Sequence, residues 1–130
     1  MNFPTTTLKS GVRIMTRPVL AEELPPEFSS YQPPGQPAVF LSWHDCGKIA
    51  TTLGGRLPTD EEWLEAFEQH PYDGGILEWT ATSEQTNSAF RVLRGGSGHD
   101  AARGCRSADR DWVEPVDRFG LVGFRLAFDK

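Results

Sequence analysis

The feature that most constrains the fold is the last third of the chain, where three ordered blocks alternate with two irregular stretches. The blocks are residues 91–97, 105–108 and 123–128. The stretches between them, 99–104 and 109–121, mix charged, aromatic and small residues with neither the helical nor the strand period. A regular frame that holds irregular, chemically mixed loops is typical of a binding surface.

Two helices are predicted upstream of this region. Ser42 is placed to cap the first, which we expect to run to Leu53 and to end at the following glycine pair. Thr59 and Glu62 form a capping box at the start of the second, in which the hydroxyl and the carboxylate each satisfy an orphan amide. The second helix is expected to end at His70, which precedes a proline.

Short strands are expected around these helices. Their positions, from alternation and β-propensity, are residues 11–15, 38–41, 76–80, 90–94 and 122–128. The sequence therefore predicts a compact α+β domain with two helices and short antiparallel strands. Residues 1–37 are expected to supply a strand and a Pro-rich connector that packs on or extends the domain of residues 38–130.

Composition disfavours some classes of partner. The chain has 130 residues and carries 18 Asp and Glu against 13 Lys and Arg, for a net charge of −5. Seven arginines lie in the last forty residues, but six carboxylates are interleaved with them, so no phosphate-binding track and no nucleic acid partner is expected. Without a signal pattern or a long apolar run, we expect no membrane insertion and a soluble chain that is cytoplasmic at synthesis.

The two cysteines, Cys46 and Cys105, permit one disulfide without requiring it. Free, buried thiols are the favoured interpretation, because a small apolar thiol is commonly buried.

Several motifs then occur in order along residues 38–128. They are Phe-Leu-Ser-Trp-His-Asp at 40–45, Gly-Arg-Leu-Pro-Thr-Asp-Glu-Glu-Trp at 55–63, Leu-Glu-Trp-Thr at 77–80, Leu-Arg-Gly-Gly-Ser at 93–97, Arg-Ser-Ala at 106–108 and Gly-Phe-Arg at 123–125. Together they resemble the formylglycine-generating-enzyme (sulfatase-modifying factor) domain, a variant of the C-type lectin fold. The resemblance implies that fold for this chain.

The same resemblance argues against the family's oxidase activity. Its cysteine nucleophiles would fall at about Gly98 and Ala102, and neither is a thiol. Cys105 alone cannot supply the paired thiolate site that copper-dependent oxidation requires. We therefore expect no enzyme, no catalytic residues and no cofactor.

Other chemical sites are also disfavoured. The three histidines, His44, His70 and His99, have no metal-ligand spacing, so no metal is expected. A triad of Ser97, His99 and Asp100 is disfavoured because residues adjacent in sequence rarely converge on one reacting atom. The glycine pair before Ser97 lacks the lysine and helix of a phosphate loop and is better suited to a tight strand exit.

Calcium-dependent lectins share the fold and offer a further alternative. Their sites use Glu-Pro-Asn or Gln-Pro-Asp with a later Trp-Asn-Asp. Glu114 and Pro115 begin such a motif, but Val116 cannot coordinate a hard cation and the second motif is absent.

A narrower resemblance covers about residues 91–125. This segment looks like the variable region of proteins diversified by retroelements, in which error-prone copying of a template changes selected codons and leaves framing codons unchanged. The matching frame is Leu-Arg-Gly-Gly-Ser at 93–97, Cys-Arg-Ser-Ala at 105–108, Arg110, Pro115 and Gly-Phe-Arg at 123–125. The resemblance implies a hypervariable surface that binds a ligand, most simply a protein, with a display or anchoring partner also conceivable.

Carried over position by position, the resemblance gives fifteen variable, ligand-binding sites: Gly98, His99, Asp100, Ala101, Gly104, Asp109, Asp111, Trp112, Val113, Glu114, Val116, Asp117, Phe119, Gly120 and Leu121. Trp112, Phe119 and Leu121 are suited to be interface anchors, although Trp112 and Phe119 could instead fill a small satellite core. The alternative function is that of a catalytically inactive or divergent member of the formylglycine-generating-enzyme family.

The frame itself is expected to be pinned by arginines and tryptophans. Each guanidinium offers five donors, so Arg94, Arg106 and Arg125 are expected to hold loop carbonyls or carboxylates. Trp43, Trp63 and Trp79 each lie in a framing motif and are expected to be core residues.

Overall fold

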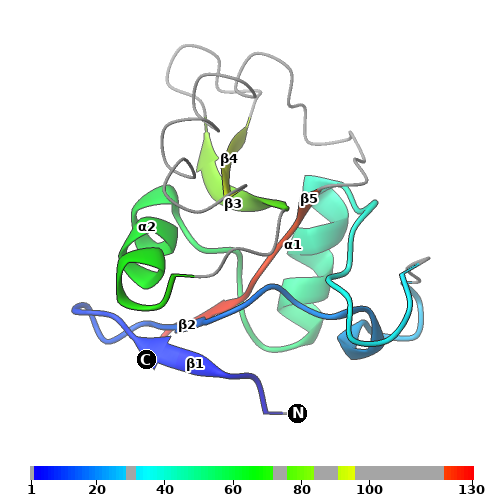
Figure 1. Cartoon of the computed structure of the whole chain (residues 1–130), viewed down its shortest axis with the longest axis horizontal. Helices are drawn as coiled ribbons and strands as arrows, with labels where there is room; N and C mark the ends of the chain where they lie inside the picture. Colours follow the sequence, from blue (N-terminus) through cyan, green and yellow to red (C-terminus); the bar gives the residue numbers. More distant parts are fainter. Residues whose placement is uncertain (1, 29–31, 72–75, 84–90, 96–121) are drawn as a thin grey trace.

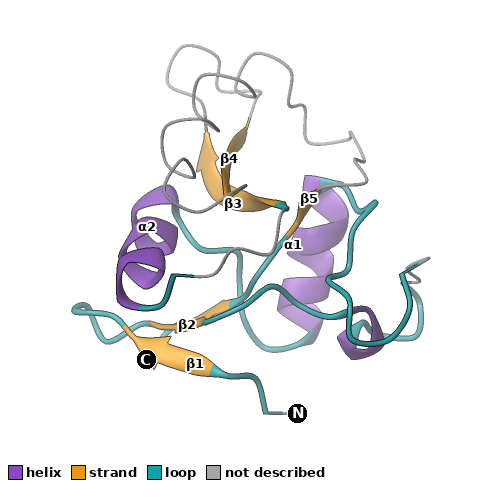
Figure 2. Cartoon of the chain, in the orientation of Figure 1, coloured by secondary structure: helices purple, strands orange, loops and turns teal. Residues whose placement is uncertain are grey.

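The computed structural model describes residues 2–28, 32–71, 76–83, 91–95 and 122–130, and Figure 1 shows how their elements are arranged. In chain order the elements are β1 (Thr5–Thr7), β2 (Arg13–Met15), the 3-10 helix η1 (Ala21–Glu23), α1 (Trp43–Thr52), α2 (Asp60–Gln69), β3 (Leu77–Ser83), β4 (Arg91–Gly95), β5 (Val122–Gly123) and β6 (Ala127–Phe128). Figure 2 shows the two α-helices on either side of the strands. The α+β class and both predicted α-helices are confirmed.

Helix α1 begins and ends as local signals predict. The Ser42 hydroxyl accepts from the Asp45 amide at 3.0 Å, and the Asp45 carboxylate accepts from the Ser42 amide at 3.1 Å, which makes a reciprocal capping box. At the other end Gly54 takes a φ of +86° and donates its amide to the Thr51 carbonyl. A residue without a Cβ adopts this left-handed conformation cheaply, so the glycine ends the helix.

Helix α2 confirms the second capping box. The Glu62 amide donates to the Thr59 hydroxyl at 3.1 Å, and the Thr59 amide donates to the Glu62 carboxylate at 2.8 Å. The helix faces the core with Trp63 and Ala66, and His70 forms its C-cap. Both helix starts are fixed by residues three positions apart, which is why a single sequence reveals them.

The strands form two small three-stranded sheets, in the orders β1-β2-β6 and β4-β3-β5. In Figure 1 the first sheet lies near the two chain termini and β3 and β4 lie at the opposite end of the domain. β1, β2 and β6 are antiparallel, and so are β3 and β4. β5 runs parallel to β3, so the expectation of antiparallel strands throughout is wrong for this pair.

The predicted single strand over residues 122–128 is also wrong. It is two short strands, β5 and β6, that belong to different sheets. The residues between them, 124–126, are buried. Their carbonyls serve other partners, because the Phe124 oxygen accepts from Val19 and the Leu126 oxygen accepts from Met15. The chain therefore crosses from one sheet to the other at this point.

The predicted strand over residues 38–41 does not form. Ala38, Val39 and Leu41 are buried, but Phe40 has a φ of +62° and interrupts the extended backbone. The nearest ladder contact is an isolated bridge from Pro37 to Leu20. Apolar character in this run reflects burial of an irregular segment rather than sheet pairing.

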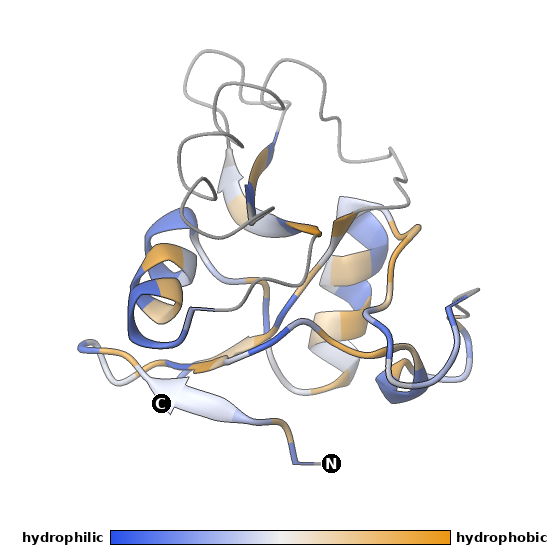
Figure 3. Ribbon diagram, in the orientation of Figure 1, coloured by the Kyte–Doolittle hydropathy of each residue, from blue (hydrophilic) through white to orange (hydrophobic). Residues whose placement is uncertain are grey.

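One main core joins these parts. Its buried members include residues from α1, β3, β4 and β5 and from the segments before α1 and after β5: Met15, Val19, Ala38, Leu41, Cys46, Ile49, Ala50, Leu57, Trp79, Leu93, Val122, Phe124 and Leu126. Figure 3 shows apolar residues along α1 and along the chain between β5 and β6. Residues from before position 38 contribute to this core, and β2 pairs with β6.

A buried ion pair lies beside the core. Arg125 donates to both carboxylate oxygens of Glu78, at 2.6 and 2.8 Å, and to the Met15 carbonyl at 3.0 Å. The Trp63 indole donates to Glu78 at 3.0 Å. The side chains of Arg125 and Glu78 are only 1% and 3% exposed. Each has lost its hydration, and the opposite charge of its partner is what mainly offsets that loss.

We expect Glu78→Gln to lower the free energy of unfolding by about 3–5 kcal/mol, because it leaves the Arg125 charge buried without its counter-charge. Urea denaturation of wild type and variant measures this loss. Asp129→Asn, which alters an exposed ion pair, is the matched control and should have a much smaller effect. The double variant Glu78→Gln/Arg125→Met should recover part of the loss, and a double variant no more stable than Glu78→Gln would contradict the charge argument.

Candidate binding face and its frame

Both ends of the segment 96–121 are held against one residue of the central strand. Gly95, the last residue of β4, pairs with Leu77 on one side, and Val122, the first residue of β5, pairs with Leu77 on the other. Adjacent strands are about 4.8 Å apart, so the two ends are roughly 10 Å apart across β3. The sheet therefore holds the two ends of this long segment at a fixed, short separation.

All fifteen predicted variable positions, from Gly98 to Leu121, lie outside the described residues, as do Cys105 and Arg106. The structure consequently describes the frame of the predicted binding face and the two points from which the segment departs. The predicted frame residues Arg94, Arg125, Trp43, Trp63 and Trp79 are among the described residues.

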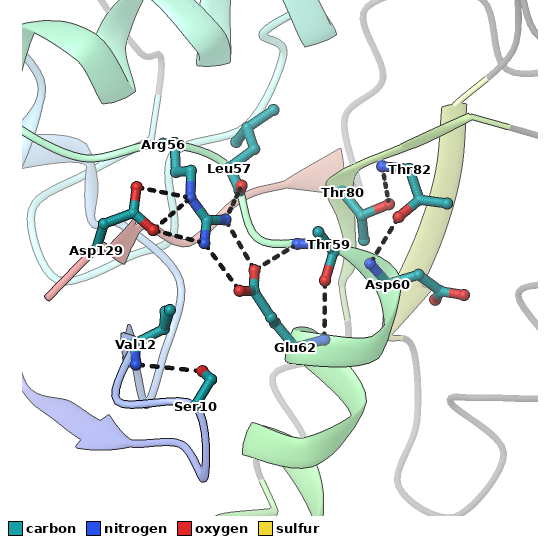
Figure 4. A network of polar contacts seen from close by, with 10 residues as sticks. All are labelled: Ser10, Val12, Arg56, Leu57, Thr59, Asp60, Glu62, Thr80, Thr82 and Asp129. Carbon is teal, nitrogen blue, oxygen red and sulfur yellow. Dashed lines mark hydrogen bonds and ion pairs between the residues drawn. The ribbon is translucent and has the colours of Figure 1, made fainter.

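Polar contacts to β3 and α2 hold strand β4 in place. Arg94 is 2% exposed and forms an ion pair with Asp60 at the start of α2. The Thr80 hydroxyl donates to the Val92 carbonyl at 2.7 Å. The Asp60 amide in turn donates to the Thr82 hydroxyl at 2.9 Å, which ties the helix to the strand (Figure 4). The predicted pinning role of Arg94 is confirmed, as is that of Arg125.

The framing tryptophans differ from one another. Trp63 and Trp79 are 1% and 0% exposed, and the Trp79 indole donates to the Leu41 carbonyl at 3.0 Å. Trp43 is only half-buried, so its assignment to the core is wrong in part. Its indole donates to the Thr80 carbonyl at 2.9 Å, and the Arg91 guanidinium lies 4.3 Å from its ring centroid.

Trp43 also lines a groove of about 490 Å³ on the outer side of α1, together with His44, Gly47, Lys48, Thr51 and Thr52. Sequence reasoning missed this feature. The signal was present as Trp43, Gly47 and Thr51 at four-residue spacing, which puts them on one helix face.

A second polar network fixes the start of α2 and the C-terminal end (Figure 4). Arg56 donates to both oxygens of Glu62 at 2.8 Å and to Asp129 at 3.0 Å. The hydrogen bond from Arg56 holds the pKa of the Glu62 carboxyl below its usual range, although partial burial opposes this shift. The pKa of Asp129 is lowered by the same guanidinium. Glu62 is thus both a helix cap and the partner of a cation.

The described thiol is not suited to nucleophilic chemistry. Cys46 is a free cysteine with no exposed surface, which confirms the expected buried thiol at this position. Burial raises the pKa of Cys46 well above its usual value, and the neighbouring Asp45 charge adds to the shift. The thiolate is the reactive form, so Cys46 is chemically inert.

Neither a metal-type cluster nor a membrane-spanning helix is present among the described residues. No group of three or more His, Cys, Asp and Glu side chains in that part of the chain is arranged to hold a metal ion. No helix there is long and apolar enough to cross a membrane.

Residues 67–130 match the sulfatase-modifying factor enzyme 1-like domain. The match starts within α2 and covers β3 to β6, and therefore the buried Glu78–Arg125 pair and both ends of the segment 96–121. It supports the predicted formylglycine-generating-enzyme type of C-type lectin fold, with which the two helices and small sheets are consistent. No curated protein matches the chain.

The Arg56–Glu62 contact generates a pH prediction. The folded-state pKa of Glu62 is depressed, so the stabilisation is complete above the unfolded pKa of about 4.3 and is lost as pH falls through the folded value. Glu62→Gln should therefore lower stability at pH 7 by about 1 kcal/mol, a modest figure because Arg56 is partly exposed. This deficit should shrink between about pH 5 and pH 3.

Thermal or urea unfolding of wild type and Glu62→Gln across that pH range measures the effect. In an Arg56→Met background the same Glu62 substitution should show a smaller pH-dependent difference, because the hydrogen-bonding cation is gone. A stability deficit that stays constant from pH 7 to pH 3 would show that the contact does not depress the pKa of Glu62.

Proposed function

We propose that this chain is a non-enzymatic, ligand-binding variable protein, diversified by a retroelement, that presents the residues of segment 96–121 to a protein target. The observation that carries the proposal is the pairing of both segment ends with Leu77. A segment whose ends are fixed by backbone pairing can change its side chains without changing how it leaves the scaffold.

The contacts around the segment's base support this proposal. Among the described residues, β4 and the chain after β5 are held by contacts such as Arg94 with Asp60 and Arg125 with Glu78, and all four residues lie outside the fifteen predicted sites. Substitutions that touch none of these contacts fall in the class that changes stability little. A scaffold of this kind tolerates many sequences in the segment while keeping one fold.

The chemistry of the predicted sites favours a protein ligand. Trp112 and Phe119 provide large aromatic surfaces of the kind that dominate protein interfaces. Asp100, Asp109 and Asp111 are acidic sites that would tune specificity and association rate more than affinity. Nucleic acid is disfavoured as a partner because the chain has a net charge of −5.

Sequencing of this gene and its flanks across the source population tests the diversification. We expect substitutions to be confined to codons of the fifteen sites and to trace to adenines in a nearby template copy. The control is the coding region for residues 38–95, which should carry no such excess. An invariant 3′ end without a template copy would remove the retroelement from the proposal, and conversion of a cysteine peptide to formylglycine by the purified chain would replace binding with catalysis.

A displayed library randomised at the fifteen sites tests binding directly. We expect most members to stay protease-resistant and some to bind a chosen probe protein, lysozyme or streptavidin, with micromolar or better affinity. The matched control is a library randomised at exposed helix positions, His44, Lys48, Thr51, Thr52, Glu61, Glu68 and Gln69, which should give few or no binders. Loss of folding in most members of the fifteen-site library would assign these residues to the core and contradict the proposal.

A further inference from the structure

Phe40 departs from the rest of the scaffold in two independent ways. It is 47% exposed, and among the described residues it is the one large hydrophobic side chain that is exposed. Its φ of +62° also makes it the one described non-glycine residue in the left-handed region. Its neighbours Val39 and Leu41 are buried, at 3% and 5% exposure.

Both departures cost stability. In the left-handed region a Cβ crowds the following carbonyl, so glycine or asparagine is the relaxed choice at this position. The exposed ring does not recover this cost through burial in the core. The flanking buried residues impose the backbone conformation, and strain maintained in this way is concentrated at functional positions. A phenylalanine here therefore points to a contact made outside the chain.

The position of Phe40 indicates which contact this is. The segment that carries it packs on β5: a Cβ on Gly123 would lie 2.9 Å from the Ala38 carbonyl oxygen and 3.9 Å from a Val39 methyl carbon. Figure 1 shows the chain entering α1 beside β5. β5 follows segment 96–121 directly, because Val122 is its first residue. The residues directly before Phe40 thus border the point where the predicted variable segment rejoins the scaffold.

We infer that Phe40 is a constant apolar contact for the protein ligand, near the junction of the variable segment with β5; this inference rests on the proposed function. The ring has no polar atoms, so it recognises an apolar or aromatic surface on the target rather than a particular hydrogen-bonding group. A partly exposed aromatic of this type can contribute affinity in variants with many different segment sequences, while the fifteen sites determine which target is bound. The net charge of −5 disfavours an anionic membrane surface as the alternative occupant.

The test uses binders from the fifteen-site library selected against lysozyme and, separately, against streptavidin. In each binder Phe40→Gly and Phe40→Asn should raise the Kd about tenfold or more while the midpoint of urea unfolding stays unchanged or rises. Lys9→Ala, an exposed change in the turn between β1 and β2, is the control and should leave the Kd unchanged. Phe40→Leu should retain part of the affinity, since it keeps an apolar side chain.

The outcomes separate the two proposals. Failure to select any binder contradicts the proposed function, and the Phe40 inference falls with it. Binders whose Kd is insensitive to Phe40→Gly overturn the inference alone. A clear fall in the unfolding midpoint of Phe40→Gly would make Phe40 a packing residue. A change from dimer to monomer in sedimentation would make it a contact between copies of this chain, and loss of binding to neutral phosphatidylcholine vesicles would make it a membrane contact; each of these overturns the inference.

Discussion

The buried pair of Glu78 and Arg125 joins parts of the molecule that belong to different sheets. Glu78 lies on β3 in one sheet, while Arg125 precedes β6 of the other sheet and also donates to the Met15 carbonyl of β2. Trp63 brings α2 to the same carboxylate. Removal of two charges from water is costly, so such a pair contributes less net stability than its geometry suggests. It does penalise any arrangement in which one partner lacks the other, and this makes the relative placement of the two sheets and α2 specific.

This fixed placement matters because the second sheet has to hold the ends of a long segment. β5 has two residues, and its parallel pairing to β3 provides few backbone hydrogen bonds of its own. Arg125, two residues beyond β5, fixes the chain just after the pairing ends, and on the other side of β3 Arg94 anchors β4 to α2. Each end of segment 96–121 is therefore secured by one ladder contact to Leu77 and by one buried arginine close behind it. The printed partners of both arginines, Asp60 and Glu78, lie in α2 and β3 and not in the segment.

The sequence predicts the parts of this structure that depend on contacts between residues close in the chain, and it does not predict the parts that depend on contacts between distant residues. Ser42 and Thr59 reveal both helix starts because a capping box is closed by residues three positions apart. Pairing between distant strands has no such local signal, so β1 was not predicted and the division of residues 122–128 between two sheets was missed. Trp43 could not be distinguished from Trp79 by composition, since its half-burial depends on how α1 sits against β3. The candidate site was predictable as a frame, from the resemblance and the arginines.

The content of the predicted variable segment could not reveal its target, for a physical reason. In the described part of the chain, charged groups that stabilise the scaffold pair with one another, as in Arg56 with Glu62. Under the proposed function, fold and recognition depend on different residues, and a sequence that satisfies one carries little information about the other. Phe40 is informative because it does not follow this division. It belongs to the scaffold in sequence, yet its ring is exposed and its Cβ is strained by the left-handed backbone. The proposed contact of Phe40 with the ligand rests on this cost, and it does not depend on which segment sequence is present.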